Sequence, residues 1–351
     1  MLGAVLDRDA GTASLFGTGE RQGSRGMLSL RIGLAIVFFW FGGIKLWPAT
    51  PAEPIVKTTI FFLPHPEFFW TLGAWEAIVG LTLLSKRTIR YAAWLLVFQM
   101  VGTQTTLMFY PEATWIAWGV PSDLGVYVLK NWILVSGMLV VAVYYTGYEM
   151  REPPTDRLES PVVVWVVSKA YWLVTEWLPR NVMIFLRSMT SLFLVVFGLL
   201  LVFGHGEAVT QVGDGFAALG IEVADSRLFL VMGLLKVVSG LTLLVDELIE
   251  VSLVAFTLYL VLGLFPMFVI PEQAFFRDWT WIAPGFFTLY FLKDLVVFGA
   301  IYAIRDTTKG IATVGAWGPY WDPLGFVDMF REFCHDAFEL ALFWSGLRTG
   351  E

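Results

Sequence analysis

Long apolar segments alternate with short polar segments along most of the chain. Because a bilayer core needs about 20 apolar residues per helix, each long segment predicts a membrane-spanning helix. The eight segments lie at residues 27–47, 68–84, 89–109, 124–147, 182–203, 228–245, 251–270 and 282–304. The pattern therefore predicts an all-α integral membrane protein with eight transmembrane helices.

The distribution of lysine and arginine supports this count. With the N-terminus inside, sixteen of these residues fall in the inside segments and four in the outside segments. Cytoplasmic loops of membrane proteins carry such an excess of positive charge. The sequence thus predicts a multi-pass protein of the cell membrane (inner or plasma membrane) with both ends in the cytoplasm.

The overall composition excludes several classes of protein. Hydrophobic residues make up 57% of the chain and charged residues 15%, whereas a soluble domain has about 25% charged residues. The net charge is −7 and no basic cluster stands out, so nucleic acid is not an expected partner. One cysteine, three scattered histidines and no glycine-rich phosphate loop argue against a metal, haem or nucleotide site.

The two halves of the chain share an internal repeat. The run Gly-Leu-Thr-Leu-Leu occurs at 80–84 and again at 240–244, an offset of 160 residues. Further matches in the same order pair Arg31 with Arg187, Glu112 with Glu272, Lys130 with Lys293, and Asn131 with Asp294. Because four spans return the chain to its starting side, the repeat predicts two parallel four-helix units.

The predicted boundaries divide the chain into five parts. They are a disordered segment at 1–26, a first four-helix unit at 27–148, an interfacial linker helix at 149–181, a second unit at 182–305 and a cytoplasmic tail at 306–351. Within the tail, an apolar stripe with an acidic opposite face predicts an amphipathic helix. Membrane lipid aside, the expected partners are other membrane or cytoplasmic subunits that contact 149–181 and 322–345.

Ionisable residues inside the predicted spans are the main functional candidates, because burying them in a membrane is costly. Glu76 and Lys236 occupy equivalent positions in the two halves, and we expect them to face each other between the units. Two interpretations are open: a switchable pair beside a quinone, proton or solute site, or an ion pair that fixes how the units dock.

Other charged residues extend this list. Lys130 and Lys293 could hold a quinone carbonyl or a carboxylate, or pair with Glu112 and Glu272. Lys45 closes the first span, where a lysine normally extends to the membrane interface. The candidates for a ligand or proton site are Glu76, Lys236, Lys130, Lys293, Lys45 and Arg31, followed by Glu112, Glu272, Asp294 and His205.

Several of these residues lie in motifs that resemble a known family. The runs 31–46 and 72–81 resemble the first and second helices of the DoxX-like membrane proteins. The runs 106–115 and 127–131 are similar to motifs of the branch that contains the reactive-chlorine-resistance inner-membrane protein. The resemblance covers 28–147 and, through the repeat, 186–304. It implies a four-helix bundle, here fused in tandem. It also implies an association with redox reactions, since some members of the family are subunits of thiosulfate:quinone oxidoreductase.

The sequence and the resemblance together lead to one expected function and two alternatives. The expected function is a redox-associated, quinone-linked membrane subunit that works with a partner. If it is an enzyme, it would be an oxidoreductase subunit without its own metal or dithiol, and quinone would be its cofactor. The alternatives are a scaffold subunit of a larger membrane complex and a transporter of a small solute or ion.

Overall fold

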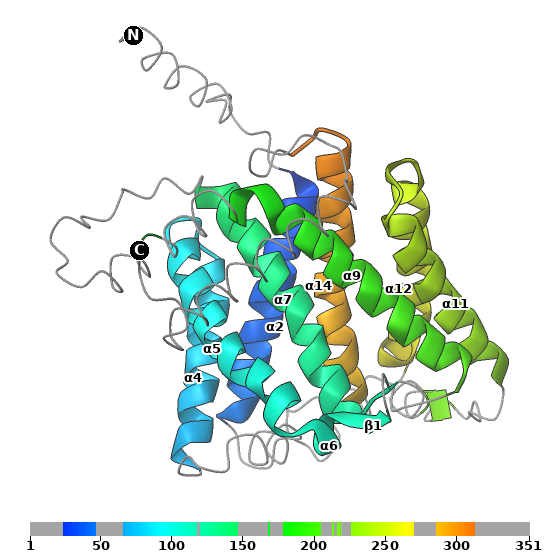
Figure 1. The fold of residues 1–351 in the computed structure, drawn as a ribbon, viewed down its shortest axis with the longest axis horizontal. Helices are drawn as coiled ribbons and strands as arrows, with labels where there is room; N and C mark the ends of the chain where they lie inside the picture. The colour runs from blue at the N-terminus through cyan, green and yellow to red at the C-terminus, as the bar shows by residue number, and fades with distance from the viewer. Residues whose placement is uncertain are drawn as a thin grey trace, which may run out of the picture.

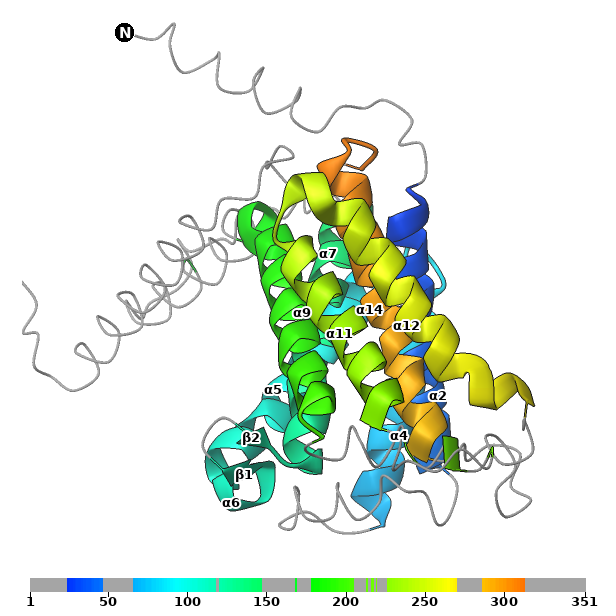
Figure 2. The same ribbon diagram turned by 90° about the vertical axis from the view of Figure 1, so that its right-hand side faces the viewer.

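The structure, a computed structural model, describes residues 24–46, 66–117, 120–146, 178–204, 226–269 and 286–312, and the single residues 168, 213, 216, 217 and 219. In this part of the chain eight long helices form one bundle (Figures 1 and 2). They are α2 (Arg25–Lys45), α4 (Glu67–Leu83), α5 (Ile89–Phe109), α7 (Asp123–Thr146), α9 (Leu178–Val202), α11 (Ser226–Leu243), α12 (Ile249–Val269) and α14 (Phe286–Thr308).

The predicted apolar segments fall on these helices. Helix α5 has the predicted bounds, and the ends of the others differ from prediction by at most four residues. The predicted helical fold is thus confirmed for the described residues. Four segments are long and apolar enough to count as candidate membrane spans: Arg25–Lys45, Val128–Tyr145, Asn181–Val202 and Asp246–Pro266.

A small β-hairpin between α5 and α7 departs from the all-helical prediction. After the short helix α6 (Pro111–Thr114), strand β1 (Trp115–Ala117) pairs antiparallel with β2 (Val120–Pro121). The amide of Ser122 donates to the Thr114 carbonyl at 2.9 Å and ties the base of the hairpin to α6. A second short element, the 3-10 helix η3 (Asp246–Leu248), joins α11 to α12.

Three of the predicted parts fall mainly outside the described residues. These are the N-terminal segment, the linker helix at 149–181 and the tail helix at 322–345. Two boundaries change, because α2 already begins at Arg25 and α9 begins at Leu178, within the segment assigned to the linker.

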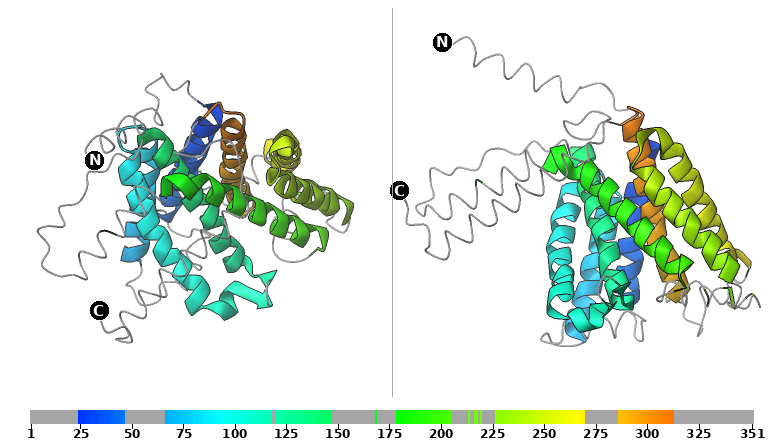
Figure 3. Two further views of the ribbon diagram at one scale, coloured as in Figure 1. Left: turned by 45° about the horizontal axis from the view of Figure 1, so that its top comes forward. Right: turned by 45° about the vertical axis from the view of Figure 1, so that its right-hand side comes forward.

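The helices of the first half (α2, α4, α5 and α7) and those of the second half (α9, α11, α12 and α14) form two groups. The groups meet along α2, α7, α9 and α14. Helix α2 packs along α4 and α14, while α9 packs along α11 and α7. Helix α5 contacts α4 and α7, and α12 contacts α11 and α14. Figures 1 and 3 show α4 and α5 at one side of the bundle, α11 and α12 at the other, and the remaining four helices between them.

Small residues permit the closest of these helix contacts. A Cβ atom added at Gly42 of α2 would lie 2.6 Å from the carbonyl oxygen of Gly73 in α4. A Cβ atom added at Gly198 of α9 would lie 2.7 Å from the carbonyl oxygen of Gly233 in α11. Such contacts let backbones approach closely in membranes, and the two pairs occupy equivalent positions in the sequence repeat.

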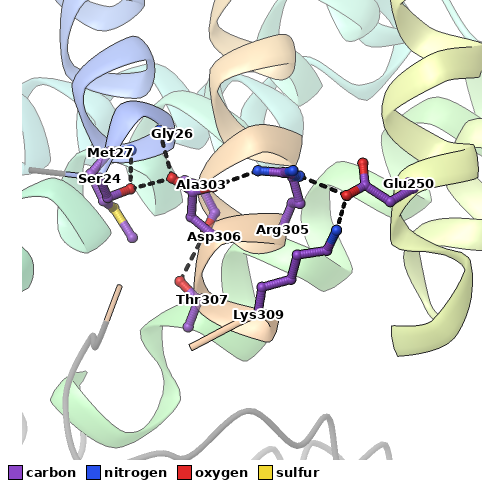
Figure 4. Close-up of polar contacts among 9 residues, drawn as sticks. All are labelled: Ser24, Gly26, Met27, Glu250, Ala303, Arg305, Asp306, Thr307 and Lys309. Atoms are coloured by element: carbon purple, nitrogen blue, oxygen red, sulfur yellow. Dashed lines mark hydrogen bonds and ion pairs between the residues drawn. The ribbon is translucent and has the colours of Figure 1, made fainter. Parts of the chain in front are cut away.

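A polar network joins the start of α2 to the end of α14 (Figure 4). The buried Asp306 accepts hydrogen bonds from Ser24 Oγ at 2.6 Å and from the Gly26 amide at 2.9 Å. Arg305 contacts Asp306 at 3.1 Å and Glu250 of α12 at 3.0 Å. Ser24 also caps α2 by accepting from an amide of its first turn. The network therefore holds three helix ends together.

Replacing Asp306 by alanine is expected to lower the free energy of unfolding by about 1.5–3 kcal/mol, the range for hydrogen bonds to a charged group. Chemical denaturation in detergent, followed by tryptophan fluorescence, would measure the loss. Thr307→Ala is the matched control, since among the described residues its hydroxyl donates to the Ala303 carbonyl of its own helix. Equal stability of the two variants would contradict a joining role for Asp306.

Candidate functional site

A buried ion pair lies between α2 and α4 in the first half of the chain. Lys45, only 1% exposed, forms it with Glu76. The same ammonium donates to the Phe41 carbonyl at 3.2 Å, and Gln99 of α5 donates to the second oxygen of Glu76. The expectation that Lys45 extends to the membrane interface is therefore wrong. The close approach of α2 and α4 turns its side chain back into the bundle.

The second half contains a pair of similar construction. Lys236 of α11 lies 3.7 Å from the carboxylate of Asp294 in α14, and both side chains are fully buried. Tyr259 of α12 donates to the same carboxylate at 2.8 Å. The Lys236 ammonium also lies 4.3 Å from the centre of the Tyr259 ring, close enough for a cation–π interaction.

These two pairs correct the expectation that Glu76 and Lys236 face each other. Each instead lies against a group of opposite charge within its own half of the chain. The reason is the placement of their helices, since α4 packs along α2 and α11 packs along α9 on opposite sides of the bundle.

Gln99 and Tyr259 are site residues that the sequence analysis missed. They lie at the same offset of 160 residues as Glu76 and Lys236. Extending the repeat alignment into the third and seventh apolar segments would have paired them. An amide inside an otherwise apolar span was a second available signal.

Two further lysines lie where the two groups of helices meet. Lys293 of α14 donates to the side-chain oxygen of Asn131 in α7 at 3.4 Å, and its ammonium lies 5.2 Å from the ring centre of Phe41. Lys130 of α7 lies 5.9 Å from the ring centre of Phe197 in α9. Phe41 and Phe197 are equivalent positions in the repeat, so each lysine contacts the first helix of the opposite half.

These residues form one continuous group, which we call the central lysine cluster. Its members are Lys45, Glu76, Lys130, Asn131, Lys236, Lys293 and Asp294, all buried. Lys293 interacts electrostatically with Lys130, Lys45 and Glu76, and Lys130 with Asp294 and Lys236. Among the described residues, the cluster thus combines four lysines with two carboxylates. Such a group can donate hydrogen bonds to a ligand that carries oxygen atoms or negative charge.

The remaining candidates lie elsewhere. Glu112 is exposed in α6, whereas Lys130 is buried against α9, so the structure does not bring this expected pair together. Arg31 lies toward the other end of α2 from Lys45, over the ring of Tyr145. His205 and Glu272 are outside the described residues.

No family model, curated protein or solved structure matches this chain. The resemblance to the DoxX-like proteins therefore rests on the sequence motifs alone.

Proposed function

We propose that the chain is a multi-pass membrane protein in which eight helices span the bilayer as two parallel four-helix units. The matching helix contacts support this architecture: α2 contacts α4 and α14 as α9 contacts α11 and α7. The starts of α2 and α9 lie at the same end of the bundle as the ends of α7 and α14 (Figure 1). The excess of basic residues favours a cytoplasmic location for this end.

We further propose that the central lysine cluster binds a small ligand with oxygen acceptors, and that this ligand is a quinone. The observation that carries the proposal is a group of four buried lysines from four helices, of which Lys130 and Lys293 lie at the boundary between the units. Charged groups inside a membrane protein are costly and commonly mark functional sites. The rings of Phe41 and Phe197 beside the lysines suit a planar ligand ring.

Each residue of the cluster has a role in this proposal. Lys130 and Lys293, one from each unit, would donate hydrogen bonds to the ligand oxygens. Glu76, held by Lys45 and Gln99, would hold or release a proton near them. A bound quinone would supply two-electron, two-proton redox chemistry. A single cysteine, Cys334, rules out a dithiol relay within the chain, so a partner subunit would exchange the electrons.

Transport of a small organic anion is the second candidate function. It is favoured by the position of the cluster, because transporters built from parallel repeats bind their substrates near the interface between the repeats. In this case the lysines would bind a carboxylate, and the two units would move against each other to expose it on either side.

Thermal unfolding of the purified full-length protein, freed of lipid-soluble ligands, would test these functions. A short-chain benzoquinone is expected to raise the midpoint in a saturable way, since a ligand stabilises the state that it binds by about 2.7 kcal/mol at a hundredfold excess over Kd. Benzoate is the matched probe, of similar size but carrying a carboxylate. Stabilisation by benzoate alone, with benzoate uptake into proteoliposomes, would indicate transport instead. If neither compound stabilised the protein and several subunits co-purified with it from native membrane, the results would favour the scaffold function.

A further inference from the structure

Two arginines at equivalent positions of the repeat have different surroundings. In the second unit, Arg187 of α9 donates through Nε to the Leu243 carbonyl at 2.6 Å and through Nη1 to the Asp246 carboxylate. This contact holds α9 against the turn that follows α11. The anionic partner of the arginine is supplied by the protein itself.

The first unit has a lysine where the second has that carboxylate. Lys86 follows α4 at the position equivalent to Asp246. The Nε and Nη1 atoms of Arg31 are buried and have no hydrogen-bond partner in the described part of the chain. The Arg31 guanidinium lies 4.7 Å from the centre of the Tyr145 ring, and the Lys86 ammonium lies 5.7 Å from the same centre. Two cations thus gather where the other unit pairs one cation with one anion.

The exchange of charge extends along the whole turn. Lys86 and Arg87 in the turn after α4, and Arg90 at the start of α5, are basic, whereas the equivalent Asp246, Glu247 and Glu250 after α11 and at the start of α12 are acidic. Of the acidic set, Asp246 and Glu250 form ion pairs with arginines of their own unit. The three basic residues form no ion pair within the described residues.

We propose that Arg31 and Lys86, which both lie over the face of Tyr145, form a binding site for a phosphate group, supplied by the headgroup of an anionic phospholipid. The phosphate would take the place that the Asp246 carboxylate has in the second unit. Guanidinium groups bind phosphate through two N–H groups at once, and lysine adds a point charge. Buried donors without partners are costly, so an anion at this place would stabilise the fold.

Apolar side chains around the site favour a lipid over free phosphate. Leu28 and Ile32 on α2 are each 42% exposed, and Leu84 and Tyr91 beside the turn are 60% and 54% exposed. They would contact the acyl chains of a lipid whose headgroup reaches Arg31. Basic residues next to a membrane-spanning segment attract anionic headgroups in the same way.

Lys86→Asp is the decisive variant, because it gives the first unit the charge arrangement of the second. Native mass spectrometry and thermal unfolding would compare it with the parent in phosphatidylcholine nanodiscs with and without phosphatidylglycerol. The parent is expected to retain phosphatidylglycerol and to unfold at a higher temperature with it. The variant should bind this lipid about thirtyfold more weakly, the effect of exchanging an attractive for a repulsive charge at the headgroup surface. In phosphatidylcholine alone it should be at least as stable as the parent, because the new carboxylate can pair with Arg31.

Arg227→Asp is the matched control, since it makes the same charge change at an exposed position at the start of α11. It should leave phosphatidylglycerol binding unchanged. Inorganic phosphate added to the parent in neutral detergent distinguishes the sources: equal stabilisation by phosphate would overturn the assignment to a lipid. Unchanged lipid binding in Lys86→Asp would overturn the site itself. None of these outcomes depends on the central lysine cluster or its ligand.

Discussion

Replacing Asp294 by alanine is expected to destabilise the protein strongly. Its carboxylate is fully buried, accepts a hydrogen bond from Tyr259 and lies 3.7 Å from Lys236. It also interacts electrostatically with Lys130. Removing one partner of a buried ion pair typically costs 3–5 kcal/mol, roughly, because the other charge stays in the interior. Chemical denaturation in detergent would measure the loss.

A second substitution distinguishes this electrostatic loss from a simple loss of packing. In the Asp294→Ala background, Lys236→Met is expected to restore much of the stability, because it removes the unbalanced charge and keeps most of the lysine volume. Glu250→Gln is the control, since this carboxylate is 44% exposed and pairs with the partly exposed Arg305 and Lys309, and its loss should cost about 1 kcal/mol or less. A double variant less stable than Asp294→Ala alone would contradict the electrostatic explanation.

The positions of the helices could be predicted from the sequence because apolar length alone decides them. Helix α5 has the predicted bounds, and the start of α9 and the end of α14 each extend four residues beyond the prediction, into less apolar sequence. The hairpin after α6 was not predicted, because five strand residues are too few to give an alternating pattern.

The partners of the buried charges could not be predicted in the same way. Apolar length places Glu76 within a span but does not determine which neighbour its side chain faces. That choice depends on how α4 is rotated against α2, and thus on close contacts such as that of Gly42 with Gly73. Lys45 shows the same limit: its position at a helix end indicated the membrane interface, but a nearby buried carboxylate binds it more favourably.

The same lysine-to-methionine substitution is expected to affect the free energy of unfolding very differently at two positions of the central lysine cluster. Lys45→Met leaves the buried Glu76 without its ion-pair partner and should cost about 3–5 kcal/mol. Among the charged side chains that the structure describes, Lys293 interacts electrostatically with Lys130, Lys45 and Glu76, that is, with two lysines and one carboxylate. Removing its charge relieves more repulsion than it removes attraction, so Lys293→Met should be within about 1 kcal/mol of the parent or more stable, given that buried charges are often replaceable by apolar groups.

Lys293→Met should weaken ligand binding even though it leaves the stability of the fold unchanged or raises it. Loss of a charged hydrogen-bond donor to a ligand oxygen would lower the affinity for a short-chain benzoquinone by roughly ten- to a hundredfold. The affinity is measured as the concentration that gives half of the maximal thermal stabilisation. A protein that keeps its stability and loses its ligand would show that the extra cation is maintained for binding, as expected where function and stability compete. If Lys293→Met were as unstable as Lys45→Met, the lysine would serve the fold. If it bound the quinone as the parent does, Lys293 would not donate to the ligand and the role proposed for it would be wrong.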